Sequence, residues 1–569
     1  MSILEAEDYE PLEELENLAA RNPHLARYIE EWYSRTGREL EYRRELTREM
    51  RRLKQFSVIY PVGEPIFIHI YSREGERAFY NAVTPSTPPE FKEILTLVEE
   101  GLAMLITAEH TFETREEHEE ILNELLDELL VVDESLDTWE YNEVRRDGKL
   151  VALEVNSETL EALKFETIME KVYLGPLEPF IRDQYIEDIS CDGVGPVFVE
   201  HKIFGSCESN IRFETSEELD DFVIRLSERT GRPVTYRRPI VDASLPDGSR
   251  INIVFGTDVS KRGSNFTIRK FSDKPVSIIN LIQWGSMSAL EAAYLWMLLE
   301  YGFSIWFCGE TASGKTTAMR AACVFINPKA KIISIEDTPE IIVPHDNWVR
   351  EVTRQGEQGE ASVELFDLLR AALRQRPNYI IVGEIRGAEA YVAFQAMQTG
   401  HPVLATFHAG SVEKVIQRLT GDPINIPKTY IDILNCVLIQ SAVRIPKTGK
   451  VERRVLSINE IAGYDPSSGR FDFIELFSWD AVDDTHIFRG EGNSFLLETK
   501  ILTLMGLSRR DAKKVYEELG RRAELLETLA ILGVSDYNHI WNVVKLCYEK
   551  GVDEVLHSIR RGGKPWLRD

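Results

Sequence analysis

The chain has 569 residues, of which 43% are hydrophobic and 28% are charged, and its formal net charge is −28. This length is sufficient for roughly two to four domains, each with a hydrophobic core. Because a protein that coats nucleic acid depends on basic surfaces, the acidic charge argues against that class, and no nucleic-acid partner is expected.

The cysteines and the apolar segments indicate a cytoplasmic protein. The six cysteines form no C-x-x-C pair, and Cys308 and Cys323 lie in apolar stretches. They predict buried, reduced thiols in place of a disulfide framework or a zinc site. No stretch reaches the roughly 18 apolar residues of a membrane span, and the amino terminus is acidic where a signal peptide is basic. We therefore expect contact with a membrane only through a partner.

Residues 1–54 are highly charged and carry apolar side chains at helical spacing, as at Leu25, Ile29 and Tyr33. This pattern predicts a helical amino-terminal extension that ends in a basic patch near Lys54. The pattern fits a helix that docks on another subunit or on a membrane protein, and it fits a solvated helix equally well.

Residues 55–257 combine strand-like and helical patterns. Two strands are predicted at 66–71 and 78–83, joined by a turn-prone stretch, and a hairpin is predicted around 196–205. A helix is predicted over 216–231, where Gly231 and Pro233 stop it. We expect this region to form one α+β domain.

The stretch 258–275 is polar, with a short apolar strand at its centre, and we expect it to be a flexible linker between domains. From 276 to 475, apolar strands alternate with amphipathic helices, as in a parallel, doubly wound sheet. The remaining residues, 476–569, are predicted to form a helical carboxy-terminal extension. The predicted fold class is therefore α/β, with an α+β domain first and helical extensions at both ends.

The stretch SIWFCGETASGKTT, residues 304–317, combines an apolar strand, a glycine-bounded loop and the start of a helix. Its spacing, G-x-x-x-x-G-K-T, is that of the phosphate-binding P-loop. Gly309 and Gly314 permit backbone angles that let consecutive N–H groups surround an anion. Lys315 adds positive charge near the β- and γ-phosphates, and Thr316 offers a hydroxyl to Mg²⁺. The residues predicted to bind ATP are Gly309, Glu310, Thr311, Ala312, Ser313, Gly314, Lys315, Thr316 and Thr317.

Three further apolar strands each end in a residue suited to phosphoryl chemistry. The strands lie at 331–335, 379–382 and 403–407, and the residues that follow them are Glu336, Gly383-Glu384 and His408. In a parallel sheet the carboxyl ends of the strands line one crevice, where ligands bind. The pattern predicts a RecA-like P-loop domain in which these side chains face the nucleotide.

Two acids are candidates for the catalytic roles. Glu384 stands where the Walker B acid belongs, and it reaches Mg²⁺ directly or through water, or polarises the attacking water. Glu336 is the second candidate base, with Glu340 one turn further if that segment is helical. Both assignments stay open; we favour Glu336 as the base for water and Glu384, with Thr316, on the metal side.

Histidine and arginine side chains complete the candidate set. His408 is either a sensor of the γ-phosphate or a structural residue at a strand end, and His401 is expected to be positional. Phosphoryl transfer also requires positive charge where negative charge develops. The arginines that could supply this charge are Arg237, Arg238, Arg250, Arg269 and Arg386.

Four segments in a fixed order make a family resemblance specific: GETASGKTT, IISIEDTPEIIVP, LLRAALRQRPNYIIVGEIRGAEA and QAMQTGHPVLATFHAGSVEKVIQRL. They resemble the Walker A, Asp box, Walker B and His box of the secretion-type motor ATPase superfamily. IEDISCDGVGPVFVEH and RLTGDPINIPKTYI look closer to its archaeal branch, which serves the archaellum and archaeal type IV pili. The resemblance covers roughly residues 55–475, and the paired C-x-x-C zinc element of bacterial members is missing.

The resemblance implies a two-domain protomer that forms a homo-hexamer on a polytopic platform protein, at the cytoplasmic face of the cell membrane. It implies that nucleotide lies between the two domains and that Arg237, Arg238 and Arg250 reach its phosphates. Closure of the domains during hydrolysis would drive the platform and extrude or turn a filament of pilin-like subunits. A ring ATPase that moves DNA in conjugation or uptake is the alternative function, and the acidic charge argues against it.

Overall fold

The protein is described by a computed structural model of the chain. The described residues are 9–47, 50–51, 53–72, 75–107, 110–271, 275–354, 362–447, 449–467 and 470–567. The chain divides into two compact units, Met1–Phe271 and Ser272–Asp569. Among the described helices, none combines the length and the hydropathy that crossing a membrane requires. All six cysteines are buried, as the sequence predicted.

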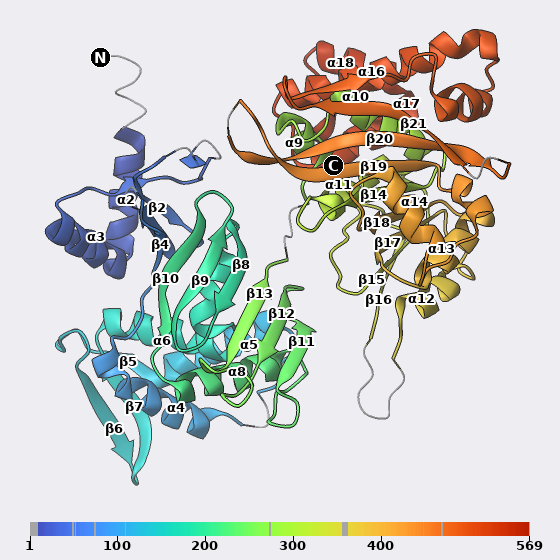
Figure 1. The fold of residues 1–569 in the computed structure, drawn as a ribbon. Coiled ribbons are helices and arrows are strands. Elements are labelled where there is room, and N and C mark those ends of the chain that lie inside the picture. The colour runs from blue at the N-terminus through green and yellow to red at the C-terminus, as the bar shows by residue number, and fades with distance from the viewer. Residues whose placement is uncertain are drawn as a thin grey trace. The chain divides into compact units, whose positions relative to one another are not determined.

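The first unit contains two sheets and the helices that cover them (Figure 1). Its helices are α2 (Tyr9–Arg21), α3 (Pro23–Thr36), α4 (Glu93–Leu105), α5 (Arg115–Leu129), α6 (Ser157–Lys171), α7 (Glu178–Arg182) and α8 (Ser216–Arg229). Its strands are β1 (Glu41–Tyr42), β2 (Phe56–Pro61), β3 (Phe67–Ser72), β4 (Ala78–Val83), β5 (Leu130–Val132), β6 (Tyr141–Arg146), β7 (Lys149–Val155), β8 (Ile186–Cys191), β9 (Gly195–His201), β10 (Gly205–Phe213), β11 (Ile240–Ser244), β12 (Arg250–Val254) and β13 (Asn265–Arg269). These bounds confirm the strands and the hairpin predicted in this region and the helix predicted over 216–231.

A ten-stranded sheet in the order β1-β2-β3-β4-β10-β9-β8-β13-β12-β11 forms the centre of the first unit. Most neighbouring pairs are antiparallel, and β1–β2 and β4–β10 are parallel. Alternation of apolar residues explains the pairing in the middle of the sheet, because Phe266 and Ile268 of β13 are fully buried between β12 and β8. The prediction of a flexible linker over 258–275 is therefore wrong where it covers β13, since this segment is a structural strand.

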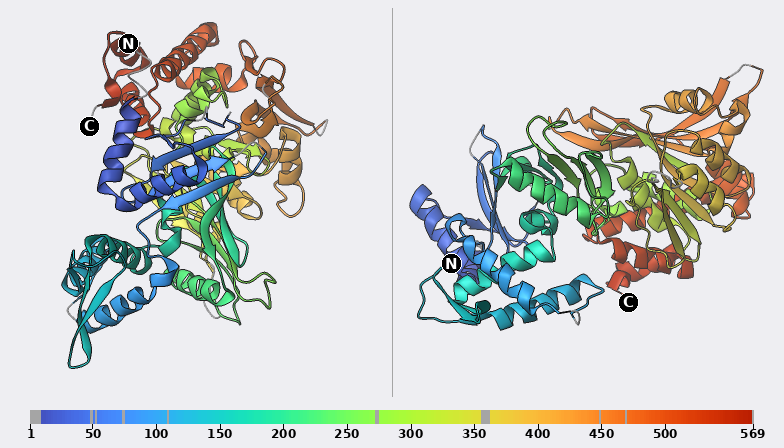
Figure 2. Two further views of the ribbon diagram at one scale, coloured as in Figure 1. Left: turned by 90° about the vertical axis from the view of Figure 1, so that its left-hand side faces the viewer. Right: turned by 90° about the horizontal axis from the view of Figure 1, so that it is seen from below.

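The described residues of the amino-terminal region, 9–47, pack onto the fold of the first unit. Leu18 of α2 and Leu25 of α3 share a buried cluster with Ile59 and Phe67, so the two helices cover one face of β2–β4 (Figure 2). The strand β1 adds to the edge of the same sheet. The predicted helical extension over residues 1–54 is thus correct for two helices and wrong for the basic stretch, where the described residues from 43 to 54 form no α-helix.

A second, smaller core lies within the region that was predicted to be one domain. The strands β5, β7 and β6 form a three-stranded sheet that packs against α4, α5 and α6. Leu126, Leu129, Leu153 and Leu163 are fully buried in this core. Because these residues do not belong to the core of the large sheet or to the cluster under α2 and α3, the small sheet and its helices have a core of their own.

The second unit is a nine-stranded sheet with helices on both faces. Its helices are α9 (Ile278–Gln283), α10 (Ala289–Glu300), α11 (Lys315–Ala322), α12 (Leu365–Ala372), α13 (Glu389–Gln398), α14 (Val412–Thr420), α15 (Leu502–Leu504), α16 (Ala512–Ile531), α17 (Tyr537–Lys550) and α18 (Val552–Arg560). Its strands are β14 (Ile305–Gly309), β15 (Ile332–Glu336), β16 (Trp348–Val352), β17 (Tyr379–Ile385), β18 (Val403–Phe407), β19 (Cys436–Arg444), β20 (Val451–Asp465), β21 (Arg470–Asp480) and β22 (Thr485–Phe488).

The order of this sheet is β16-β15-β17-β18-β14-β19-β20-β21-β22. The strands from β16 to β19 are parallel, and β20, β21 and β22 extend the sheet in antiparallel pairs. The predicted doubly wound parallel domain is confirmed for the first six strands. Because β21 crosses residue 475 and β22 follows it, the boundary predicted there is wrong, and residues 476–488 belong largely to the sheet.

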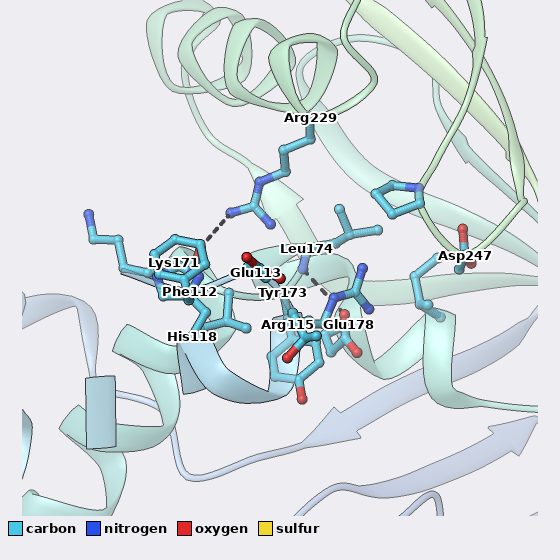
Figure 3. A pocket seen from close by; sticks show the side chains of 14 residues that line it. Phe112, Glu113, Arg115, His118, Lys171, Tyr173, Leu174, Glu178, Arg229 and Asp247 are labelled. Atoms are coloured by element: carbon cyan, nitrogen blue, oxygen red, sulfur yellow. Dashed lines mark hydrogen bonds between the residues drawn. The ribbon is translucent and has the colours of Figure 1, made fainter. Parts of the chain in front are cut away.

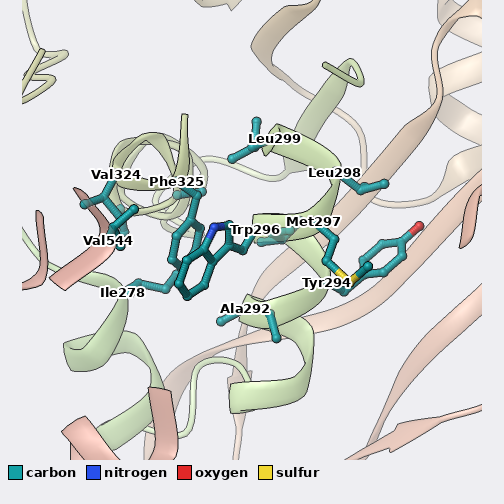
Figure 4. Close-up of a cluster of buried hydrophobic side chains, with 14 of the residues drawn as sticks. Ile278, Ala292, Tyr294, Trp296, Met297, Leu298, Leu299, Val324, Phe325 and Val544 are labelled. Atoms are coloured by element: carbon teal, nitrogen blue, oxygen red, sulfur yellow. The ribbon is translucent and has the colours of Figure 1, made fainter. Parts of the chain in front are cut away.

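Two apolar clusters fill the two faces of this sheet. The helices α12, α13 and α14 cover one face, and α10, α16, α17 and α18 cover the other (Figure 1). On the second face, the rings of Trp296 on α10 and Phe325 stack with centroids 4.9 Å apart, and Val544 of α17 packs beside them (Figure 4). The carboxy-terminal helices are thus part of the core of this unit.

Candidate functional site

The P-loop joins β14 to α11 and is closely approached by the neighbouring strand β19. A Cβ atom on Gly309 would overlap the carbonyl oxygen of Gln440 and lie 2.6 Å from Oγ of Ser313. Gly314 has a φ of +92° and precedes the first residue of α11. Glycine is required at both positions, at the first by the close approach and at the second by the left-handed backbone.

Lys315 folds back over the loop. Its Nζ donates hydrogen bonds to the carbonyl oxygens of Gly309 and Glu310, at 3.0 and 2.8 Å. Burial lowers the pKa of Lys315, and the negative charge of Glu384 opposes this effect. The ammonium group is therefore held at the loop by two neutral carbonyls, which a triphosphate would outcompete because it carries full negative charge.

Two residues that sequence reasoning missed support the loop from β19 and β20. Gln440 is buried and lies next to Gly309 and Gly314. Arg453 of β20 donates from Nε to the carbonyl oxygen of Ala312, at 3.0 Å. Ala312 has a positive φ of 60°, so this bond helps to hold a backbone conformation that alanine rarely adopts. No motif marks Arg453, because its contact spans 141 residues of sequence.

The predicted strand endings lie at one edge of the sheet. The strands β15, β17, β18 and β14 are direct neighbours and all run parallel. Their carboxyl ends carry Glu336, Glu384, His408 and the P-loop, respectively. The structure therefore brings together the residues that the sequence analysis expected to meet.

Glu336 is almost completely buried, with 2% of its surface exposed. Its Oε1 accepts hydrogen bonds from the N–H groups of Glu340 and Ile341, both at 2.8 Å, while Nε of Arg350 lies 3.9 Å from Oε2. Burial raises the pKa of Glu336 to about 7, although the two N–H groups and Arg350 act in the opposite direction. The segment after β15 is not helical, so Glu340 is placed by its N–H bond to Glu336 and not by a helical turn.

Glu384 lies in a different environment at the end of the adjacent strand. Its side chain is 31% exposed, and Oε2 accepts a hydrogen bond from Nη2 of Arg386 at 2.6 Å. Between the two acids, Gly383 leaves room for Glu336, because a Cβ atom there would lie 3.2 Å from Cγ of Glu336. Glu336 is thus shielded from water, whereas Glu384 is partly hydrated. We expect this difference to give the two carboxylates different chemical roles.

The two histidines differ in their contacts. The backbone carbonyl of His408 accepts a hydrogen bond from Arg418, whose guanidinium lies 5.0 Å from the ring centroid of Phe407. The imidazole of His408 makes no hydrogen bond with any residue that the structure describes. His401 instead lies with Nδ1 3.0 Å from the hydroxyl of Thr399. The side chain of His408 is therefore the one that is available to a ligand.

The remaining candidate arginines belong to the first unit, whereas the P-loop belongs to the second. Arg237 and Arg238 are exposed, in a turn that backbone hydrogen bonds between Thr235 and Arg238 close. Arg250 forms an ion pair with Asp242 at 2.9 Å. Arg269 pairs with Asp188 at 3.1 Å. Their predicted contact with phosphate stays a prediction.

The residues around the P-loop fit a nucleotide with Mg²⁺. Within the described residues, no three His, Cys, Asp or Glu side chains are grouped to hold a metal ion by themselves. Mg²⁺ at a triphosphate needs only one or two protein oxygens, because phosphate and water supply the others. Thr316 in the first turn of α11 and the carboxylates of Glu336 and Glu384 provide such oxygens. Oγ of Ser313 and Oε2 of Glu336 are buried and make no hydrogen bond within the described part of the chain, so both oxygens have bonding capacity left for a ligand.

The sequence matches a known protein family. A family model described as type II/IV secretion system protein matches residues 170–500. The chain belongs to this family. The match spans the P-loop, both acids, His408 and all the candidate arginines. The family is that of the secretion-type motor ATPases, as the motif order indicated, and the chain is therefore a nucleotide-binding protein.

The chain is also similar to individual proteins. The chain is 46% identical over 553 residues to the uncharacterized protein MJ0900 of Methanocaldococcus jannaschii, an alignment that covers 96% of this chain and 98% of that protein. It is 28% identical over 299 residues to the type IV secretion system protein VirB11 of Bartonella quintana, which covers 46% of this chain and 84% of the relative. Among solved structures, the VirB11 ATPase of Brucella suis in complex with sulphate matches 52% of this chain and 94% of its own, with 25% identity and a TM-score of 0.26.

Proposed function

We propose that this family member is a Mg²⁺-dependent ATPase that hydrolyses ATP at the P-loop and uses the energy to power an archaeal type IV pilus-like filament. The proposal rests on one observation: the P-loop, Glu336 and Glu384 all lie at the carboxyl ends of parallel strands in one sheet. The 46% identity to an archaeal protein supports the archaeal branch.

Glu336 is the proposed base for the attacking water. A general base works best when its pKa lies near the operating pH, and burial raises the pKa of Glu336 to about 7. Its Oε2 makes no hydrogen bond with the described residues and lies 3.9 Å from Nε of Arg350, and this is the oxygen that would accept the proton of the attacking water. The N–H groups of Glu340 and Ile341 fix the other oxygen and hold the carboxylate in one orientation.

Glu384 and Lys315 act on the phosphate side. Glu384 is partly hydrated and close enough to Lys315 for its charge to affect the pKa of that lysine. Together with Thr316, Glu384 would hold Mg²⁺ through its water shell, and the metal neutralises charge on the β- and γ-phosphates. Lys315 would leave the carbonyls of Gly309 and Glu310 and bind phosphate oxygens instead.

We propose that the protein assembles as a homo-hexamer at the cytoplasmic face of the cell membrane. Nucleotide would be enclosed when the first unit supplies Arg237, Arg238 and Arg250 to the phosphates, and hydrolysis would change the relation of the two units. A polytopic platform protein would pass this motion to a filament of pilin-like subunits, a pilus, an archaellum or a secretion pseudopilus, which is assembled or rotated.

Phosphate release from ATP tests the site directly. We compare the wild-type protein with Lys315→Ala, Glu336→Gln and Glu384→Gln, and we measure binding of a fluorescent ATP analogue in parallel. Lys315→Ala should lose binding and hydrolysis, whereas Glu336→Gln should keep binding and lose about 100-fold or more in rate. Lys447→Ala, at an exposed lysine paired with Asp483 in the same unit, is the control. Normal hydrolysis by Lys315→Ala would overturn the proposal.

The same assay separates the filament motor from the DNA-moving alternative. Lipid vesicles that contain the co-purified membrane partner should raise the rate of a membrane-bound motor. Stimulation by single-stranded DNA with no response to membranes would favour the ring ATPase that translocates DNA.

A further inference from the structure

A pocket of about 370 Å³ lies entirely within the first unit, where the start of α5, the end of α6 and the end of α8 meet (Figure 3). This volume is in the range of small-molecule sites, which hold roughly 300–1,000 Å³. Its lining contains Arg115, Lys171 and Arg229, and it contains none of the residues assigned above to nucleotide chemistry.

Arg229 reaches the pocket from the last turn of α8. Its guanidinium donates a hydrogen bond to the backbone carbonyl of Glu170 at the end of α6. Burial lowers the pKa of Arg229, and the positive charges of Arg115 and Arg225 lower it further. The charges of Glu170 and Glu178 oppose this effect, each more weakly than either arginine, and neither these carboxylates nor any other forms an ion pair with Arg229 in the described part of the chain.

Arg115 and Lys171 add further positive charge from α5 and α6. The guanidinium of Arg115 lies 5.5 Å from the ring centroid of Tyr173, and within the described chain it makes no hydrogen bond or ion pair. Arg115 is also the first residue of α5, a 15-residue helix in which Glu116 and Glu117 of the first turn already offset the partial positive charge of the amino-terminal end. Lys171 pairs with Glu99 at the edge of the pocket.

The acidic side chains that line the pocket are mostly engaged elsewhere. Glu178 accepts hydrogen bonds from Arg182 and from the N–H of Leu174, at 2.9 and 3.3 Å. Asp247 accepts from the N–H and the hydroxyl of Ser249. Glu113 remains, and it is exposed to solvent. Arg115 and Arg229 thus line one pocket, and neither has an ion-pair partner among the described residues, so an anion in this pocket could bind both guanidinium groups.

We infer that this pocket binds a phosphate-bearing small molecule, with Arg115 and Arg229 on its phosphoryl oxygens. Guanidinium groups match phosphate because their planar donors bind two oxygens at once, and partial burial strengthens such bonds. At the pocket wall, the rings of Phe112 and His118 are stacked with centroids 3.9 Å apart and planes at 2°, and Phe112 is 50% exposed. Inorganic phosphates and mononucleotides share the required chemistry, and the nucleotide adds a ring that this surface could stack against.

Hydrogen exchange of the full-length protein locates the binding. The probes are pyrophosphate and AMP, and each is added to the wild-type protein and to Lys315→Ala, in which the P-loop no longer contributes. We expect slower amide exchange at the start of α5 and at residues 171–174 in both proteins. The Arg115→Gln and Arg229→Gln variants should lose this protection, or need at least tenfold more ligand to reach it. Arg212→Gln, at an exposed arginine of the same unit that pairs with Glu214, is the matched control and should keep it.

Stronger protection by AMP than by pyrophosphate would assign the ring contact to Phe112 and His118, and equal protection would assign phosphate recognition alone. Either result supports the site. If neither probe slows amide exchange at these segments in Lys315→Ala, the inference is overturned, and the pocket variants are not needed to decide it. Protection that persists in both Arg115→Gln and Arg229→Gln also overturns it.

Discussion

Replacement of Glu336 by glutamine should stabilise the second unit above neutral pH. The substitution removes a carboxylate that is only 2% exposed, and the glutamine oxygen can still accept the N–H groups of Glu340 and Ile341. Burial raises the pKa of Glu336 from 4.5 to about 7. Since one pKa unit corresponds to about 1.4 kcal/mol, this rise of about 2.5 corresponds to roughly 3 kcal/mol.

The sign of the effect follows from the direction of the pKa change. Because the pKa of Glu336 is higher in the folded than in the unfolded protein, its contribution to stability is complete below pH 4.5 and is lost as the pH rises through about 7. Above pH 7 the wild-type protein therefore bears the full cost of the buried charge. The advantage of Glu336→Gln should be largest at pH 8 and small at pH 5.

Calorimetry without nucleotide at pH 8 and pH 5 measures this effect. The transition of the second unit is the one that added ATP raises, because ligand binding stabilises the folded state. A gain of about 3 kcal/mol corresponds to a rise in Tm of roughly 5–10 °C at pH 8 for a unit of this size. The matched control is Glu384→Gln, where the acid is 31% exposed and the change should be small. An equal gain at both pH values, or none at pH 8, would refute the reasoning.

Three further substitutions test contacts that only the folded chain shows. Gly309→Ala should abolish binding of a fluorescent nucleotide, because the new methyl group would overlap the carbonyl of Gln440; Gly463→Ala, which meets no atom within 4 Å, should bind normally. Arg453→Gln should weaken nucleotide binding about tenfold through loss of its bond to Ala312, roughly 1.4 kcal/mol, and equal affinities would contradict this role. Arg522→Ala should lower the free energy of unfolding by about 3–5 kcal/mol in urea, because Arg522 is 5% exposed and binds Glu300 and Glu518 at 2.5 and 2.9 Å. A loss below about 1 kcal/mol, similar to that for Lys513→Ala at an exposed position, would show that this buried cation is not needed.

Much of the site could be predicted from local patterns. The strands that end in Glu336, Glu384 and His408 are short apolar runs, and parallel strands with buried faces have such sequences. Since the carboxyl ends of parallel strands meet at one edge, the approach of these residues to the P-loop followed from chain order. The spacing from Gly309 to Thr316 likewise predicted the anion-binding loop, because its geometry is local.

Local patterns could not predict which strands pair with each other when the paired strands lie far apart in the sequence. The alternation in β13 predicted a strand, but its pairing with β8 requires residues about 80 positions earlier, so the segment was taken for a linker. The same holds for β21 and β22, which lengthen the sheet past residue 475.

The amino-acid sequence by itself determined which residues carry the chemistry and on which strand ends they stand, because periodicity and glycine spacing act over a few neighbouring residues. The tertiary structure decided how these residues behave. Arg453 reaches Ala312 only after β20 has been placed beside β19. Glu336 acquires a pKa of about 7 only when the surrounding chain excludes water from its carboxylate, since desolvation depends on packing from all sides.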